Sequence, residues 1–158
     1  MIFHPKRPWI YVITELSNKV HCFNLSNGGK LITKQFVNIL PESYRGESYA
    51  ADIIIDPSGN FLYASNRGHN SISVFSISRH NGKLRFIANT SSKGNYPWSL
   101  DIDNQGKYLL VTNQLSNNIV IYKRNLNNGL ISKFLELNDI QSPVAARFLC
   151  KTNKDGNV

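Results

Sequence analysis

Residues 56–72 read DPSGNFLYASNRGHNSI, in which a tight turn leads into an apolar run and then into a second polar turn. The tetrapeptide DPSG at 56–59 has turn chemistry, because proline fixes φ and glycine tolerates a positive φ. A related turn, DNQG, stands at 103–106, and His4-Pro5 occupies the same place near the N-terminus. An apolar run of strand length follows each of these turns, so they mark the start of a recurring unit.

The apolar runs align with one another, together with the polar turns that follow them. Residues 11–20 read YVITELSNKV, residues 63–72 read YASNRGHNSI and residues 110–119 read LVTNQLSNNI, without a gap. Asn18, Asn70 and Asn117 therefore fall in register, 52 and 47 residues apart. Self-similarity at a period of about 50 residues indicates a repeat architecture.

Each unit is expected to contain about four short strands joined by tight turns. The segment 71–77, SISVFSI, alternates polar and apolar residues as a half-buried strand does. We predict strands at 50–55, 61–66, 71–78 and 84–90 in one unit, and at 97–103, 108–113, 118–123 and 130–137 in the next. This period is typical of a β-propeller blade, so the predicted fold class is all-β, with blades of four antiparallel strands. A single sandwich is the alternative, but it leaves the register of the repeat unexplained.

The predicted organisation is a partial β-propeller over residues 1–150. Its blades are placed at about 1–40, 41–92 and 93–139, with a closing strand at 143–149 and a polar C-terminal tail at 151–158. The first blade is expected to begin at its second strand, with only residues 1–3 left for the first. Because a closed propeller needs roughly four to eight blades, we expect an open array. Its uncovered blade edges favour self-association.

The composition suits one globular domain. The 158 residues are 41% hydrophobic, and no apolar run approaches the roughly 20 residues that span a bilayer. The N-terminal residues lack the apolar stretch of a secretory signal, so we expect a cytoplasmic location and no membrane partner. Cys22 and Cys150 have no zinc-ligand spacing, and we interpret both as buried thiols.

The basic charge is dispersed along the chain. A net charge of +8 comes from 18 basic and 10 acidic residues, and Lys6-Arg7 and Lys123-Arg124 are the only adjacent basic pairs. Dispersed charge favours a solvated surface over a nucleic-acid site. The second interpretation is a field that attracts an anionic small substrate.

Residues 46–53, GESYAADI, followed by residues 56–72, resemble the signature of the seven-bladed lactonase family. That family contains the propeller-type bacterial 6-phosphogluconolactonases and the fungal carboxymuconate-lactonising enzyme. Residues 103–114 resemble the signature of the next blade, and Ser142-Pro143-Val144 the family's closing strand. The resemblance implies about three blades of a seven-bladed propeller. It also implies a carboxylic ester hydrolase, with 6-phosphogluconolactone of the pentose phosphate pathway as substrate and neither metal nor organic cofactor.

Two positions of the family's central-channel site carry over to this chain. Glu15, in TEL, matches an acidic residue of the family, and Arg67, in SNRGH, matches its arginine. The carboxylate would serve as general base, and the guanidinium would clamp the anion or stabilise the oxyanion. Because Thr14 aligns with Asn66, we expect Glu15 and Arg67 at similar depth on one rim. A structural ion pair or solvated rim charges are the alternative.

Five further residues are candidates for substrate binding: His69, Glu47, Asp52, Asn66 and Gln114. His69 follows Arg67 by two residues, so on an extended segment it would share the same face. A structural hydrogen bond is the alternative role for His69. Glu47 and Asp52 flank the start of a blade, where hydrogen bonding at the strand entry is the alternative.

The chain departs from the usual residues of the family at three positions in or near these motifs. Thr14 stands where asparagine is usual, Asp52 where glutamate is frequent, and Trp98 where arginine is frequent. Trp98 either packs at a blade junction or lines the channel. A histidine and an arginine of the family's site would fall upstream of Met1. The absent histidine and arginine, together with Trp98, favour a first rival interpretation, a truncated non-catalytic half-propeller. The second rival is a binding scaffold that completes its ring by pairing with another chain.

Overall fold

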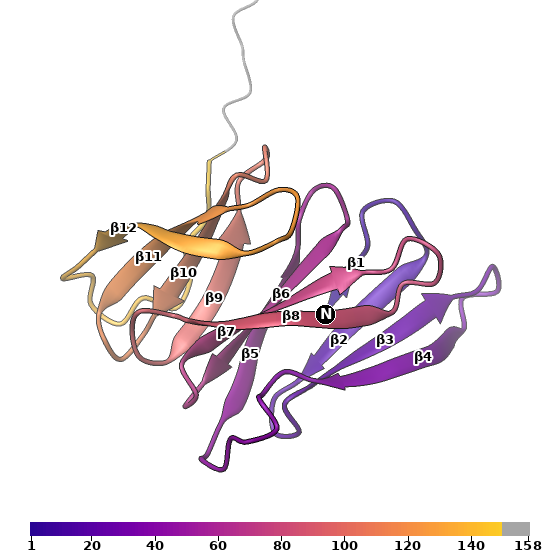
Figure 1. Cartoon of the computed structure of the whole chain (residues 1–158), viewed down its shortest axis with the longest axis horizontal. Helices are drawn as coiled ribbons and strands as arrows, with labels where there is room; N and C mark the ends of the chain where they lie inside the picture. Colours follow the sequence, from indigo (N-terminus) through magenta and orange to yellow (C-terminus); the bar gives the residue numbers. More distant parts are fainter. Residues whose placement is uncertain (150–158) are drawn as a thin grey trace, which may run out of the picture.

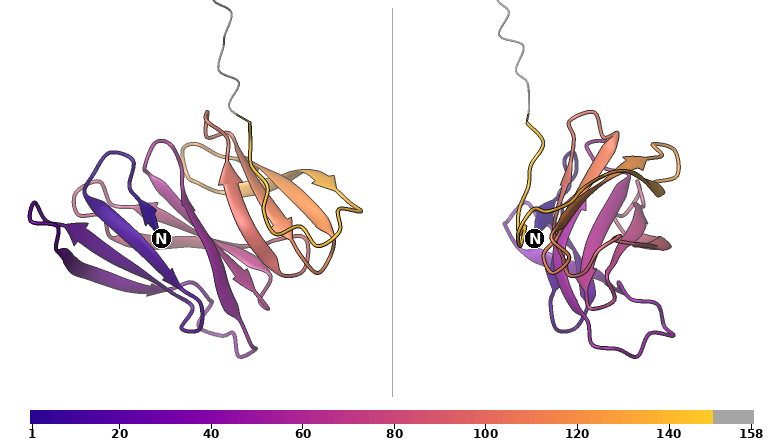
Figure 2. Two further views of the ribbon diagram at one scale, coloured as in Figure 1. Left: turned by 180° about the vertical axis from the view of Figure 1, so that it is seen from behind. Right: turned by 90° about the vertical axis from the view of Figure 1, so that its left-hand side faces the viewer.

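A computed structural model describes residues 1–149 and shows an all-β architecture. The described residues form three four-stranded antiparallel sheets, which lie side by side as blades (Figures 1 and 2). The first blade comprises β1 (Ile2–Phe3), β2 (Trp9–Thr14), β3 (Lys19–Leu25) and β4 (Leu31–Asn38). The second comprises β5 (Tyr49–Ile55), β6 (Phe61–Arg67), β7 (Ser71–Ile77) and β8 (Leu84–Ser91). The third comprises β9 (Pro97–Ile102), β10 (Tyr108–Asn113), β11 (Asn118–Arg124) and β12 (Ile131–Leu137).

The eight strands predicted for the second and third blades are confirmed, and their ends differ from the prediction by at most one residue. The first blade has one strand more than expected. Ile2 and Phe3 pair with Tyr11 and Ile10, so the two-residue β1 completes a four-stranded sheet. The alternating pattern predicted the other strands, whereas a strand of two residues is too short to show a period.

The strand expected over 143–149 is not formed. The segment instead lies beside β9 through side-chain contacts: the Arg147 guanidinium donates to Ser99 Oγ (2.9 Å), and the Phe148 amide donates to Asp101 Oδ2 (2.7 Å). A strand requires a backbone ladder with a neighbour, and these contacts do not supply one. Cys150 and the predicted tail at 151–158 lie outside the described residues.

The three register-defining asparagines share one backbone conformation. Asn18, Asn70 and Asn117 have φ values of 50°, 54° and 55°, in the left-handed region that asparagine tolerates better than most residues. Two of the side chains also hold the connection that leaves their blade. The Tyr96 amide donates to Asn70 Oδ1 (2.9 Å), and the Ser142 amide donates to Asn117 Oδ1 (2.9 Å). The repeated asparagine therefore serves the turn and the link to the next blade together.

The core lies between successive blades, in two apolar clusters. The first cluster packs blade 1 against blade 2 through side chains that include Tyr11, Leu62 and Phe75. The second packs blade 2 against blade 3 through side chains that include Tyr63 and Tyr122. All five are wholly buried. Burial between sheets leaves the strand ends, and the turns that join them, on two opposite rims.

Candidate functional site

Glu15, Arg67 and Gln114 occupy equivalent places in the three blades. Glu15 directly follows β2, Arg67 is the last residue of β6, and Gln114 directly follows β10. These three strands are the second strands of their sheets, counted from the side of β1, β5 and β9. The repeat therefore places a carboxylate, a guanidinium and a carboxamide at one rim.

Arg67 and Glu15 form an ion pair that joins blade 2 to blade 1. Arg67 Nη2 lies 2.5 Å from Glu15 Oε1 and 3.3 Å from the Ala50 carbonyl oxygen. The Arg67 side chain is 9% exposed, whereas that of Glu15 is 57% exposed. The guanidinium is thus held by protein on most sides, while the carboxylate remains accessible to water.

The donors of Arg67 are only partly used by the protein. Nε is buried and has no hydrogen-bond partner among the described residues, and Glu15 Oε2 accepts no hydrogen bond from them. A buried donor without a partner costs roughly 1–3 kcal/mol. Such groups call for an explanation, and a site that awaits a ligand or water is one of the recognised explanations.

Two aromatic rings flank the same guanidinium. Arg67 Cζ lies 4.5 Å from the ring centroid of Trp98 and 5.3 Å from that of Tyr96. Both distances fall in the range of cation–π attraction, which stabilises a cation over a ring face. Trp98 is 37% exposed, so its indole lies at the wall of the site and not in a blade core. Of the two roles considered for Trp98 in the sequence, the structure supports the one that lines the site.

These side chains border a cleft of about 520 Å³. Its wall is formed by Glu15, Arg67 and Trp98, together with Met1, Ile13, Ala50 and Ala51. Most of the other lining residues are apolar. The Glu15 carboxylate and the Arg67 guanidinium therefore lie in a surface with few other charged side chains. Such a cleft suits a small polar molecule that is placed by few directional contacts.

Asp52 and Asn66 serve the framework. Asp52 Oδ2 accepts from the Leu100 amide (2.8 Å) and Oδ1 from the Ile53 amide (2.8 Å), which ties β5 to β9. Asn66 is wholly buried; its Oδ1 accepts from the Ser48 hydroxyl. A register shift in β5 between Ala50 and Ile53 accompanies this arrangement of Asp52. Neither residue lines the cleft.

His69 does not share the face of Arg67, and that prediction is wrong. The strand ends at Arg67, and Gly68, with φ of 91°, turns the chain. His69 Nδ1 instead pairs with Ser71 Oγ (2.6 Å), and its ring packs edge-on against Tyr44. Burial lowers the pKa of His69. Its alternative role, a structural hydrogen bond, is the one that the geometry supports.

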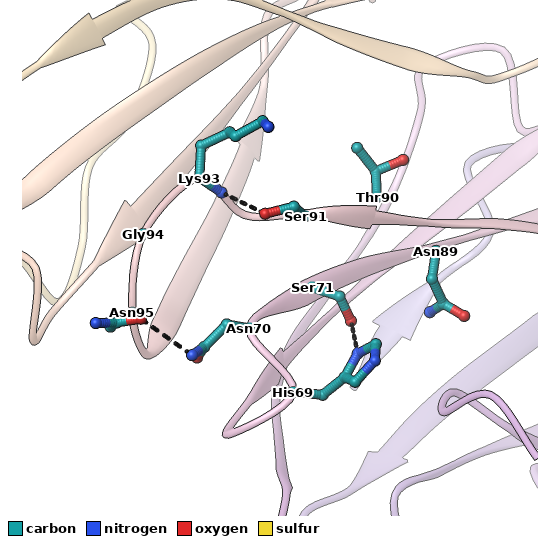
Figure 3. Close-up of a pocket in the computed structure, with 9 residues that line it drawn as sticks. All are labelled: His69, Asn70, Ser71, Asn89, Thr90, Ser91, Lys93, Gly94 and Asn95. Carbon is teal, nitrogen blue, oxygen red and sulfur yellow. Dashed lines mark hydrogen bonds between the residues drawn. The ribbon is translucent and has the colours of Figure 1, made fainter. Parts of the chain in front are cut away.

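His69 lines a separate hollow of about 610 Å³ (Figure 3). The other lining residues are Asn70, Ser71, Asn89, Thr90, Ser91, Lys93, Gly94 and Asn95. This hollow is larger than the cleft beside Glu15, but it is more open to solvent and no carboxylate lines it. Of these two spaces, the cleft beside β2 and β6 is the one lined by a carboxylate and a guanidinium, those of Glu15 and Arg67, and we therefore take it as the candidate site.

Glu47 and Gln114 also lie outside the cleft lining. Glu47 is exposed, and its backbone carbonyl accepts from the Tyr44 hydroxyl (3.0 Å). The backbone N–H of Gln114 donates to the Tyr96 carbonyl (3.0 Å), at the end of the loop that leads into β9 and Trp98. The Ala50 carbonyl and the apolar wall could not be predicted from the sequence, because backbone acceptors and small side chains carry no motif.

The described residues contain neither a metal-binding cluster nor a membrane-spanning helix. In residues 1–149 no group of three or more His, Cys, Asp and Glu side chains is arranged to hold a metal ion. Over the same residues there is no helix long and apolar enough to cross a membrane.

Successive four-stranded blades and an acid–base pair at the rim define a β-propeller protein with a candidate hydrolytic cleft. Comparison with known families places the chain more narrowly. Residues 1–148 match the family described as Lactonase, 7-bladed beta-propeller, and the chain belongs to that family.

The relatives agree with this assignment. The chain is 32% identical over 148 residues to the 6-phosphogluconolactonase of Bacillus subtilis, covering 93% of this chain and 42% of that protein. It is 44% identical over 135 residues to the 6-phosphogluconolactonase of Formosa agariphila, covering 84% of this chain and 37% of that protein. The chain thus spans about two fifths of the length of these relatives.

Solved structures show the same architecture. The periplasmic gluconolactonase of Pseudomonas aeruginosa superposes with a TM-score of 0.89 at 27% identity, over 94% of this chain and 41% of that one. A structure described as a putative 6-phosphogluconolactonase from Bacteroides uniformis superposes with a TM-score of 0.82 at 34% identity, over 91% of this chain and 41% of that one.

Proposed function

We propose that the cleft of Glu15 and Arg67 hydrolyses a sugar lactone, with 6-phosphogluconolactone as the substrate. The observation that carries the proposal is the pair itself, in which an accessible carboxylate lies 2.5 Å from a buried guanidinium at the wall of a cleft. Lactone hydrolysis needs a base for water and a positive charge near the carbonyl oxygen. Relatives named 6-phosphogluconolactonase support the choice of substrate.

The pair divides the chemistry between its two members. Glu15 accepts a proton from water as the water oxygen bonds to the lactone carbonyl carbon. Arg67 stabilises the oxyanion that forms, because a guanidinium donates charge-assisted hydrogen bonds to oxygen. The ring C–O bond then breaks, and Glu15 returns the proton to the departing ring oxygen. The net reaction consumes one water and yields the open-chain acid, without a redox change.

Trp98 adds a surface for the sugar ring. Its indole is 37% exposed beside the guanidinium, and it is the one aromatic ring among the residues that form the wall. In this role Trp98 orients the lactone, while Arg67 and Glu15 act on its carbonyl. Residues His69, Glu47, Asp52, Asn66 and Gln114 act in this proposal through the framework around the cleft and not by contact with substrate.

The test is the hydrolysis of freshly generated 6-phosphogluconolactone by the full 158-residue chain, compared with the spontaneous rate. Arg67→Ala and Glu15→Gln should each lower the catalysed rate by about 100-fold or more, the usual cost of losing an oxyanion donor or a base. Arg85→Ala is the matched control, since Arg85 is exposed on β8 and forms no ion pair in residues 1–149. A rate equal to the background, from folded protein, contradicts the proposal.

A second candidate function is sugar-lactone binding without turnover. The contacts of Arg67 favour this function. Its guanidinium packs against Trp98 and pairs with Glu15, so it is held rigidly and forms a fixed surface against which a lactone would bind. Saturable binding of the lactone without hydrolysis would support this function. The setting that we propose for the hydrolase is the pentose phosphate pathway in the cytoplasm. Self-association through the open blade edges stays a prediction, which the mass of the chain in solution tests.

A further inference from the structure

A second hollow lies at the opposite rim of the first two blades. It has a volume of about 290 Å³, and its lining includes Lys6, Arg7 and Arg79. It sits at the starts of β2 and β6, whereas Glu15 and Arg67 stand at the ends of the same strands. The strand lengths therefore separate this hollow from the lactone cleft, and the two share no lining residue.

The three basic side chains of this hollow are not neutralised by the protein. Lys6, Arg7 and Arg79 are exposed, and none forms an ion pair within residues 1–149. Arg79 Nε donates to Asn60 Oδ1 (3.1 Å), which holds the guanidinium at the hollow. Three cations around one small space repel one another, so an anion placed among them is stabilised.

The carboxylate that acts on His4, that of Asp56, is already engaged in hydrogen bonds of its own turn. Asp56 acts electrostatically on His4 and is buried, with 4% of the residue exposed. Its oxygens accept from the Ser58 hydroxyl and from the amides of Asn60 (2.9 Å) and Phe61 (2.8 Å). Asp56 also lies across the next blade junction from a buried arginine. It is therefore committed to its own turn and leaves the hollow basic.

The positive charge is particular to this junction and is not a requirement of the repeat. Lys6 and Arg7 are the third and second residues before β2. The corresponding residues are uncharged in the other two blades: Ser58 and Gly59 before β6, and Gln105 and Gly106 before β10. The second residue after β7 is Arg79, whereas the second residue after β11 is Leu126. All three basic residues thus depart from the repeat, and they converge on one hollow.

His4 fixes the turn that carries Lys6 and Arg7. One ring nitrogen, Nε2, lies 3.0 Å from the Gly59 carbonyl oxygen, and Nδ1 accepts from the Lys6 amide (3.1 Å). Because Nδ1 is an acceptor here, Nε2 is the donor and the ring is neutral. The His4 ring also packs edge-on against Trp9, with the centroids 5.0 Å apart. Both nitrogens are used, so His4 positions the hollow without binding the ligand.

We propose that this hollow binds the phosphoryl group of a small phosphorylated molecule. Two guanidinium forks and one ammonium are the groups that recognise phosphate, and Asn60 adds a neutral polar side chain at the wall. The volume is at the small end of ligand sites, which suits a phosphoryl group with few attached atoms. The ligand is inorganic phosphate or a compact phosphate ester, and the chemistry of recognition is the same for both.

Trp9 reports on the hollow, because it lines the space and is one of only two tryptophans in the chain. The other, Trp98, lies in the lactone cleft, so a Trp98→Phe background isolates the signal of Trp9. Inorganic phosphate, glucose 6-phosphate and glucose are titrated at constant ionic strength, with chloride as the reference anion. We expect saturable changes with the two phosphates and none with glucose or chloride. Tighter binding of the ester than of phosphate identifies the ester as the ligand class.

Variants locate the binding site. Arg7→Gln and Arg79→Gln should each weaken phosphate binding by about tenfold, the loss of one charge-assisted contact. Lys107→Gln is the matched control, since Lys107 is exposed at the equivalent turn of the third blade and should leave binding unchanged. Amide chemical shifts of Gly59 and Asn60 provide a readout that does not depend on fluorescence. The proposal is overturned if phosphate moves neither signal, or if both variants bind as the parent does.

Discussion

The Tyr11 hydroxyl donates a hydrogen bond of 2.8 Å to the Gly82 carbonyl, across the junction of the first two blades. The Tyr63 hydroxyl makes the same bond to the Gly129 carbonyl, also at 2.8 Å, across the next junction. Burial raises the pKa of both phenols, that of Tyr63 to about 12, so both remain protonated donors. The repeat therefore copies a specific polar contact between blades along with the strands.

Tyr11→Phe should destabilise the chain by roughly 1–3 kcal/mol, because the Gly82 carbonyl then loses its donor inside the junction. Chemical denaturation followed by circular dichroism measures the change. Tyr49→Phe is the control, since Tyr49 is half-buried at the start of β5 and its hydroxyl forms no hydrogen bond with the described residues. Equal effects of the two substitutions would contradict a specific role of the Tyr11 bond.

Gly82→Ala should cost more than a glycine substitution in an open turn. Gly82 has φ of 73°, and an added Cβ would lie 2.5 Å from Cδ2 of Trp9. The left-handed conformation and the overlap together should cost roughly 2–4 kcal/mol. Gly28→Ala is the matched control, because a Cβ there meets nothing within 4 Å and φ is not in the left-handed region. Comparable losses in the unfolding free energy would refute this explanation.

Arg124→Ala should be among the most destabilising single changes. The Arg124 side chain has no exposed surface. Its Nη2 lies 3.4 Å from Asp56 Oδ2 without hydrogen-bond geometry, and its Nε donates to the Tyr63 hydroxyl (2.9 Å). Removing it leaves the Asp56 carboxylate buried without its cation, at a cost of roughly 3–5 kcal/mol. Adding Asp56→Asn should recover part of that loss, and the denaturation midpoints of the single and double variants measure it. If the loss in the double variant equals the sum of the losses in Arg124→Ala and Asp56→Asn, the two side chains are not coupled.

The free energy of unfolding should decrease at acidic pH, in part because of His69. Burial lowers its pKa, so the unfolded chain binds the proton more tightly than the folded chain. The contribution is present above pH of about 6.5 and is lost as the pH falls below it. His69→Gln should reduce the slope of unfolding free energy against pH in that window. His80→Gln, at an exposed turn position, is the matched control, and an equal change of slope in both variants would contradict this role of His69.

Sequence patterns predicted the strands and the rim positions well, because both depend on local rules. Alternation and turn chemistry placed β5 to β12, and the gap-free repeat brought Glu15 and Arg67 to one rim, where they form an ion pair. The two-residue β1 was missed, since it gains its stability from β2 and not from its own composition.

Side-chain direction could not be predicted in the same way. The register shift in β5 directs Asp52 to the Leu100 amide, and the turn at Gly68 carries His69 away from Arg67. Both effects follow from neighbouring blades and loop geometry, which a strand pattern does not encode. The cation–π contact of Trp98 with Arg67 likewise joins the first strand of one blade to the second strand of another.

Glu15, Arg67 and Gln114 stand at one position of a unit that occurs three times in the described residues. Gene duplication of such a unit supplies a ready-made ring of side-chain positions with inherited geometry. A single codon change then exchanges an acid for a base or an amide, while the packing between blades is left as it was. Substitutions at the rim can therefore change the chemistry of the site more readily than substitutions in the core, where every blade must still pack against its neighbour.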